Sequence, residues 1–199
     1  MRARRAFRGR DRRLCVRDRV GVPRRTRAAT RPARREPDRL RLAVIVVERR
    51  RTVAAPRSSV WAVLVDPWRF GDWWPRAVSS ERAGAGAWRA RLAPPRRPQA
   101  TVTAVFERCE THEPTRFVFR QRVDGTPFGR TFRRVEWAFE LARRGDGVSE
   151  RTEIAATARV ELKGLGRLGS LQVRRAFRRT ADSALARLDA LLAGDPRKA

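Results

Sequence analysis

The chain has few side chains of the kinds that carry out enzyme chemistry. Its one histidine, His112, lies in the segment THEPTR beside Glu113 and Pro114, where we expect an exposed turn. Any Ser-His-Asp or Cys-His arrangement would depend on this single histidine, and a turn away from the apolar segments is a poor place for one. The sequence therefore predicts no catalytic residue.

Signals for metals and cofactors are weak as well. The two cysteines, Cys15 and Cys109, do not have the spacing of metal ligands, so we predict no metal site. They are best interpreted as free thiols in a reducing compartment, and we expect a cytoplasmic protein. The run GLGRLG at 164–169 follows no parallel strand unit, so it favours a bend into a terminal helix over a dinucleotide site. We predict no cofactor.

Aromatic side chains are the better candidates for a binding site. Most of them fall on one predicted face of a sheet, and the others lie on helices that would approach that face. They could simply fill the core, or they could line a pocket for an apolar or aromatic ligand, with Gln121 orienting that ligand by hydrogen bonding. The candidate ligand-binding residues are Trp73, Trp74, Trp88, Phe106, Phe117, Phe119, Gln121, Trp137, Phe139 and Phe177.

Alternating segments predict the strands that must position these residues. Apolar and polar side chains alternate with a period of two, which is typical of a sheet with one covered face and one wetted face. Reversals are predicted at Asp124-Gly125 and at Gly145-Asp146-Gly147. The predicted strands cover residues 46–53, 88–92, 101–106, 117–122, 135–141 and 153–160.

Two short helices are predicted after the first strand. Pro56 ends that strand, and Ser58 or Ser59 can cap the helix that follows. Asp66-Pro67 should stop this helix, because proline disfavours a helical conformation in the residue before it. Pro67 can then open the second short helix.

A long helix is predicted from about Ser170 to Leu192. Apolar residues recur there every three or four positions, which gives one apolar stripe, and Gly194 follows as a C-terminal stop. An open antiparallel sheet needs its apolar face covered, and this helix is the one predicted element long enough to cover it.

Three segments together resemble the START-like, or SRPBCC, superfamily of polyketide cyclases, dehydrases and lipid-transport proteins. They are TVAAPRSSVWAVLVDPWRFGDWWP at 52–75, ERCETHEPTRF at 107–117 and KGLGRLG at 163–169. The resemblance covers residues 46–193. It implies an α+β helix-grip fold, in which a curved antiparallel sheet wraps around a long C-terminal helix, with two short helices after the first strand. It also implies an apolar cavity between the sheet and the helix.

This resemblance implies that residues 44–196 form a domain that binds a hydrophobic small molecule, lipid-like or polyketide-like. The alternative is a cofactor-independent polyketide cyclase or dehydratase that shapes a flexible chain in the same cavity. Gln121 and Thr152 could assist such an enzyme, whereas Asp66 and Asp72 are explained as a helix stop and a helix-corner residue. We expect a monomer or a weak homodimer.

Charge is the remaining signal. The net charge is +27, and 46 of the 48 basic residues are arginine, which is more typical of a GC-rich coding sequence than of a selected nucleic-acid surface. Residues 1–43 hold 17 arginines and four acids, without any apolar period. We expect them to be a disordered extension, and a start at Val44, Val46 or Val47 would remove it. The alternatives are an arm for nucleic acid or an anionic membrane, and a targeting peptide, which the absence of serine disfavours. We expect no specific nucleic-acid partner and no transmembrane segment.

Overall fold

The computed structural model describes residues 44–94, 100–145, 150–164 and 169–194. All of them belong to one compact unit, Leu40–Ala199. The predicted Arg-rich extension at 1–43 lies outside the described residues, and so do residues 165–168 of the glycine-containing run.

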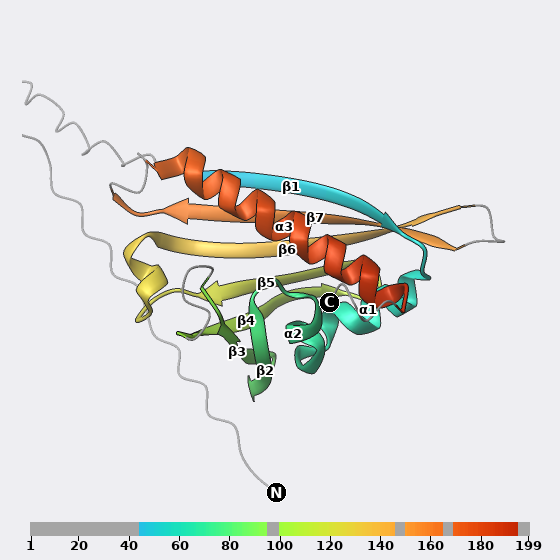
Figure 1. The fold of residues 1–199 in the computed structure, drawn as a ribbon, viewed down its shortest axis with the longest axis horizontal. Helices are drawn as coiled ribbons and strands as arrows, with labels where there is room; N and C mark the ends of the chain where they lie inside the picture. Colours follow the sequence, from blue (N-terminus) through green and yellow to red (C-terminus); the bar gives the residue numbers. More distant parts are fainter. Residues whose placement is uncertain (1–43, 95–99, 146–149, 165–168, 195–199) are drawn as a thin grey trace, which may run out of the picture. The chain divides into compact units, whose positions relative to one another are not determined.

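A seven-stranded antiparallel sheet is the centre of the fold, with the order β1-β7-β6-β5-β4-β3-β2 (Figure 1). The first strand therefore pairs with the last. The strands are β1 (Val44–Val53), β2 (Ala77–Gly84), β3 (Ala87–Leu92), β4 (Val102–His112), β5 (Arg116–Arg122), β6 (Phe132–Arg144) and β7 (Arg151–Leu162). The helices are α1 (Arg57–Val65), the 3-10 turn η1 (Pro67–Arg69), α2 (Phe70–Trp73), the 3-10 turn η2 (Pro127–Arg130) and α3 (Ser170–Leu192).

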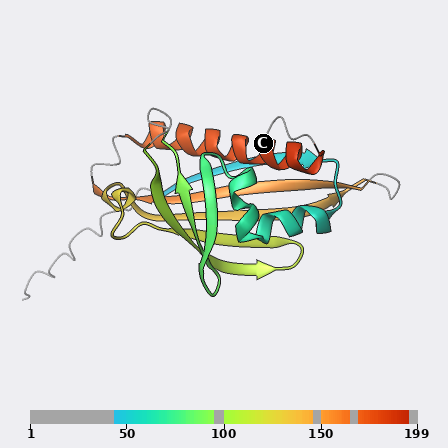
Figure 2. The ribbon, with the colours of Figure 1, turned by 60° about the horizontal axis from the view of Figure 1, so that its bottom comes forward.

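One face of the curved sheet carries all three α-helices, and α3 runs along β1 and β7 (Figures 1 and 2). This arrangement is the α+β helix-grip fold, as predicted. Small residues on both surfaces let α3 approach the sheet, because Ala156 and Ala158 on β7 and Ala181 and Ala184 on α3 are all fully buried. In the C-terminal half of α3, Ala184, Leu185 and Leu188 pack into this core and are at most 2 % exposed.

Proline residues set the end of α1 and the start of the helical turn that follows it. Helix α1 stops at Val65, and Asp66 takes an extended conformation with ψ 112° before Pro67, as predicted. The Asp66 carboxylate accepts a hydrogen bond from the backbone N–H of Trp68 at 2.9 Å, which caps η1. The prediction of a serine cap on α1 is wrong: Pro56 occupies the N-cap position, and Ser58 and Ser59 lie exposed in the first turn.

Strand β2 is an element that the alternation did not predict. It is an edge strand, paired only with β3, and none of its residues is buried. An edge strand without a buried face needs no apolar alternation, so the period of two is missing. The strand follows directly from α2 and carries the chain to the turn at 84–86.

Candidate functional site

A pocket of about 330 Å³ lies between α3 and the sheet, next to Phe177 and Thr180 of the helix. This volume falls at the lower end of the roughly 300–1,000 Å³ that small-molecule sites occupy. The described residues that line it come from β3, β4, β5, β6, η2, α3 and the segments that follow α2 and β3. They are Trp74, Pro75, Arg76, Leu92, Ala93, Pro94, Val102, Gln121, Phe128, Trp137, Phe177 and Thr180.

Aromatic rings form two walls of this pocket. The rings of Trp74 and Trp137 meet nearly at right angles, with centroids 5.0 Å apart, and Trp137 stacks on Phe177 at 5.7 Å. The Trp74 carbonyl is held by the backbone N–H of Ala77 at 3.2 Å and by the Arg187 guanidinium at 3.5 Å. Both tryptophans are buried, whereas Phe177 on the helix is half-buried. The pocket thus offers flat apolar surfaces in fixed positions.

Three lining residues are polar, and they differ in what they can offer a ligand. The side-chain nitrogen Nε2 of Gln121 is buried, and it has no hydrogen-bond partner among the described residues. Thr180 already donates its hydroxyl hydrogen to the Ala176 carbonyl at 3.1 Å. Arg76 is exposed and adopts the left-handed backbone conformation, with φ 69°. A buried donor without a partner costs about 1–3 kcal/mol, so an acceptor on a ligand would be stabilising beside Gln121.

The structure brings four of the ten predicted ligand-binding residues to this pocket: Trp74, Gln121, Trp137 and Phe177. Trp88 lines a second pocket, next to the turn between β2 and β3. The other five residues line neither of these two pockets and lie within the core. They are Trp73, Phe106, Phe117, Phe119 and Phe139.

These five core rings form a tightly packed cluster next to the pocket. Phe119 lies at its centre, with ring centroids 5.8 Å from Phe106 and 6.0 Å from Phe139. Phe70 of α2 joins the cluster at 4.9 Å from Phe106, a residue that the sequence reasoning did not include. All of these rings are at most 1 % exposed. They support the pocket walls and stabilise the fold by burying apolar area.

Several lining residues were missed by the sequence reasoning. Leu92 ends β3 on the predicted inner face, so its alternation was the available signal. Phe128 lies in η2, where no alternation exists, and it reaches the pocket from a turn. The remaining missed residues are Pro75, Arg76, Ala93, Pro94, Val102 and Thr180.

Groups suited to acid–base or metal chemistry lie away from the pocket. Its described lining includes no carboxylate, imidazole, thiol or amine. Thr152 is fully buried and donates a hydrogen bond to the Ala55 carbonyl at 2.8 Å, so it fastens β7 to the segment before α1. His112 lies 2.9 Å from the Glu110 carboxylate at the exposed end of β4.

Cys109 is an exposed, unbridged thiol in the described part of the chain, whereas Cys15 lies outside that part. Partial burial raises the pKa of the Cys109 thiol, which lowers the fraction of reactive thiolate at neutral pH. Within the ranges that the structure describes, no three His, Cys, Asp or Glu residues gather as metal ligands would. Among the described helices, none combines the length and apolar character needed to cross a bilayer.

Comparison with solved structures finds the same fold in several proteins of low sequence identity. A conserved protein from Geobacillus kaustophilus has a TM-score of 0.63 at 16% identity, over 75% of this chain and 96% of that one. A START superfamily protein from Mycobacterium smegmatis has a TM-score of 0.56 at 14% identity, over 73% and 98% of the two chains. The Zhui aromatase/cyclase from Streptomyces sp. R1128 has a TM-score of 0.52 at 22% identity, over 78% and 95%.

No curated protein matches the sequence. The sequence model of the family described as polyketide cyclase/dehydrase and lipid transport, however, matches residues 44–193. That range contains every described strand and all of α3, and thus the whole pocket described above. The chain therefore belongs to the polyketide cyclase/dehydrase and lipid-transport family.

Proposed function

We propose that this protein binds a hydrophobic small molecule in the pocket between α3 and the sheet. The observation that carries the proposal is the combination of fixed aromatic walls with one buried, unpaired donor on Gln121. Small-molecule sites commonly join a mostly apolar surface with a few polar groups that fix orientation. The ligand should therefore have an apolar body and at least one hydrogen-bond acceptor.

Of the two ligand classes implied by the family, a polyketide-like molecule fits this pocket better than a lipid. The walls formed by Trp74, Trp137 and Phe177 are flat, and aromatic faces stack best on planar rings. The volume of about 330 Å³ suits a compact ligand rather than a pair of long acyl chains.

Binding without catalysis is our leading proposal, and a cofactor-independent cyclase or dehydratase is the alternative. An aromatase/cyclase among the proteins of the same fold favours the alternative. The described lining favours binding, because it lacks a carboxylate or imidazole with a tuned pKa for proton transfer. Incubation with a candidate polyketide distinguishes the two: a cyclase converts it over many turnovers, whereas a carrier returns it unchanged.

Titration with Nile red, an uncharged fluorescent dye, tests the binding proposal. The dye must be uncharged because a protein with net charge +27 attracts anionic probes non-specifically. We expect saturable binding to the full chain. Thr180→Trp should abolish it, because Thr180 lines the pocket on α3 and a larger ring there fills the space.

Gln172→Trp is the matched control, since it adds the same ring at an exposed position of the same helix. This control should bind Nile red as the unmodified protein does. Absence of saturable binding to the unmodified protein would overturn the proposal. Equal binding to the Thr180→Trp variant would overturn it as well, because the dye would then occupy another site.

A further inference from the structure

A second pocket of about 210 Å³ lies at the opposite end of the β2–β3 hairpin from the first one. Pro67 of η1 borders it on one side, the turn at 84–86 on another, and Trp88 of β3 lies beneath. The two pockets share no lining residue. Whatever occupies the second pocket therefore interacts with different side chains from those proposed above.

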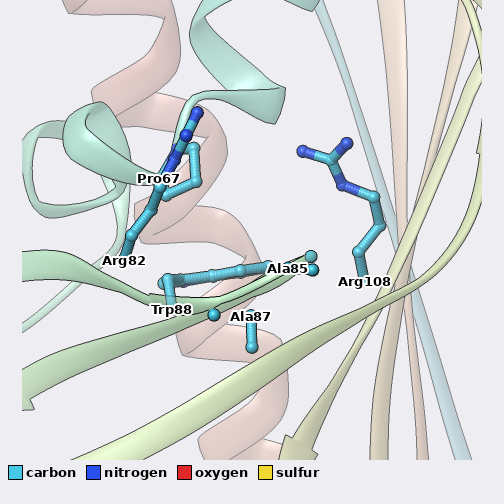
Figure 3. Close-up of a pocket in the computed structure, with 8 residues that line it drawn as sticks. Pro67, Arg82, Ala85, Ala87, Trp88 and Arg108 are labelled. Carbon is cyan, nitrogen blue, oxygen red and sulfur yellow. The ribbon is translucent and has the colours of Figure 1, made fainter.

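Two arginines face this pocket from different strands. Figure 3 shows Arg82 of β2 and Arg108 of β4 on opposite sides, with Trp88 below both guanidinium groups in this view. Neither arginine has a carboxylate within 4.0 Å among the residues that the structure describes, whereas nearby Arg89 pairs with Glu81 at 3.0 Å. The pocket thus holds two positive charges that no described acid neutralises.

The position of Arg108 is fixed by its surroundings. One of its terminal nitrogens donates to the Val65 carbonyl at 3.3 Å, and its guanidinium carbon lies 5.7 Å from the ring centroid of Phe117. A guanidinium has five N–H donors in a planar fork, so a single 3.3 Å contact leaves most of them available. Arg108 is therefore held in place without being saturated.

The floor of the pocket is an aromatic ring, that of Trp88. Trp88 is 2 % exposed, and its indole nitrogen has no hydrogen-bond partner among the described residues. At the rim, Gly86 has φ 69° and its carbonyl accepts from the backbone N–H of Arg108 at 2.7 Å, which ties the turn to β4.

We propose that this second pocket binds an oxyanionic group, a phosphate or a carboxylate, through Arg82 and Arg108, above the ring of Trp88. Hydrogen bonds from guanidinium to oxyanions are short and charge-assisted, and the planar fork matches the oxygen geometry of both groups. The proposal does not depend on the function proposed for the first pocket.

Nuclear magnetic resonance of the full chain, labelled with ¹⁵N, tests this proposal directly. The indole N–H signal of Trp88 is assigned among the six tryptophans with Trp88→Phe. Inorganic phosphate and acetate are then titrated separately, with chloride holding the ionic strength constant. We expect a saturable shift of this signal, because the Trp88 ring lies beneath both guanidinium groups and reports on an anion bound between them.

Arg82→Ala is the main variant, since Arg82 has no described ion-pair partner whose loss would perturb folding. It should weaken anion binding about tenfold, the change expected when one charge-assisted hydrogen-bonding group is removed. Arg91→Ala removes the same charge from β3 outside the pocket and should leave the affinity unchanged. Arg108→Lys keeps the charge without the fork and should also weaken binding.

A shift with phosphate but not with acetate would identify a site for phosphate groups. Equal shifts with the two anions would show that the pocket accepts a carboxylate as well. The proposal is overturned if neither anion moves the Trp88 signal. It is overturned as well if Arg91→Ala weakens binding as much as Arg82→Ala, since diffuse attraction to the basic protein would then explain the effect. Thr180→Trp should leave the anion titration unchanged, which separates this test from that of the apolar pocket.

Discussion

The two halves of α3 differ sharply in how they contact the rest of the molecule. In the C-terminal half, Ala184, Leu185 and Leu188 are at most 2 % exposed. In the N-terminal half, Phe177 and Thr180 are only half-buried and line the pocket, and Leu171 is 72 % exposed. One half of the helix thus packs into the core, and the other half lines the pocket.

The two halves of α3 also differ in their ion pairs. Asp182 and Asp189 of the C-terminal half pair with Arg49 and Arg51 of β1, at 3.0 and 2.7 Å. The exposed arginines of the N-terminal half have no described carboxylate within 4.0 Å. They are Arg174, Arg175, Arg178 and Arg179. Core packing and pocket lining are thus separated along the helix, so variants in the two halves should affect different measurements.

Leu188→Ala should have the largest effect. Truncation of a fully buried leucine costs about 2–5 kcal/mol of the free energy of unfolding, through lost burial and the cavity left behind. Urea denaturation measures this cost. Val173→Ala, in the half-buried N-terminal half, should cost clearly less. Equal losses for the two variants would contradict the division of the helix.

Phe177→Ala should change binding more than folding. The variant removes one aromatic wall, and losing a stacking contact with the dye, worth roughly 0.5–1.5 kcal/mol, should lower Nile red affinity about two- to tenfold. Because the side chain is half-buried, the stability loss should be smaller than for Leu188→Ala. Folded Leu188→Ala protein should keep the affinity of the unmodified chain, and a loss there would show that the two halves are not separate.

Asp189→Asn should have the smallest effect. Its partner Arg51 is 44 % exposed, and exposed ion pairs contribute at most about 1 kcal/mol. Denaturation midpoints of the variant and the unmodified protein should converge in about 1 M salt, where screening acts within a few ångströms. A difference that persists at high salt would assign the contribution to the hydrogen bond from the Arg51 Nε to the carboxylate rather than to charge.

The sequence predicts α3 with its observed bounds, because its apolar stripe repeats every three or four residues from Val173 to Leu191. It also predicts the end of α1 at Asp66-Pro67, since proline acts through local sterics alone. Strand β2 could not be found by alternation, because it buries no residue and exists through its pairing with β3. Helix-capping propensity favours Ser58 or Ser59 as the N-cap of α1, but Pro56 occupies that position.

The candidate site was harder to predict than the fold. Alternation shows that Phe119 and Trp137 face inward, but both are fully or almost fully buried and only Trp137 reaches the pocket. Whether an inward-facing ring reaches the pocket depends on how α2 and α3 pack against the sheet, which is a property of the tertiary structure. Phe128 lies in a turn and Arg82 in an edge strand. In neither element does a periodic pattern indicate which residues line a pocket.

The pairing of β1 with β7 has a consequence for how the chain reaches its native state. The buried hydrogen bond from Thr152 to Ala55 joins residues 97 positions apart, next to the ten-residue ladder of these two strands. Closing such a distance costs entropy before any contact compensates for it, so folding should be slow. During synthesis, the backbone N–H and C=O groups of β1 lack the strand with which they pair until β7 has left the ribosome. The basic triplet at 49–51 is suited to that interval, because like charges keep unpaired strands of neighbouring chains apart.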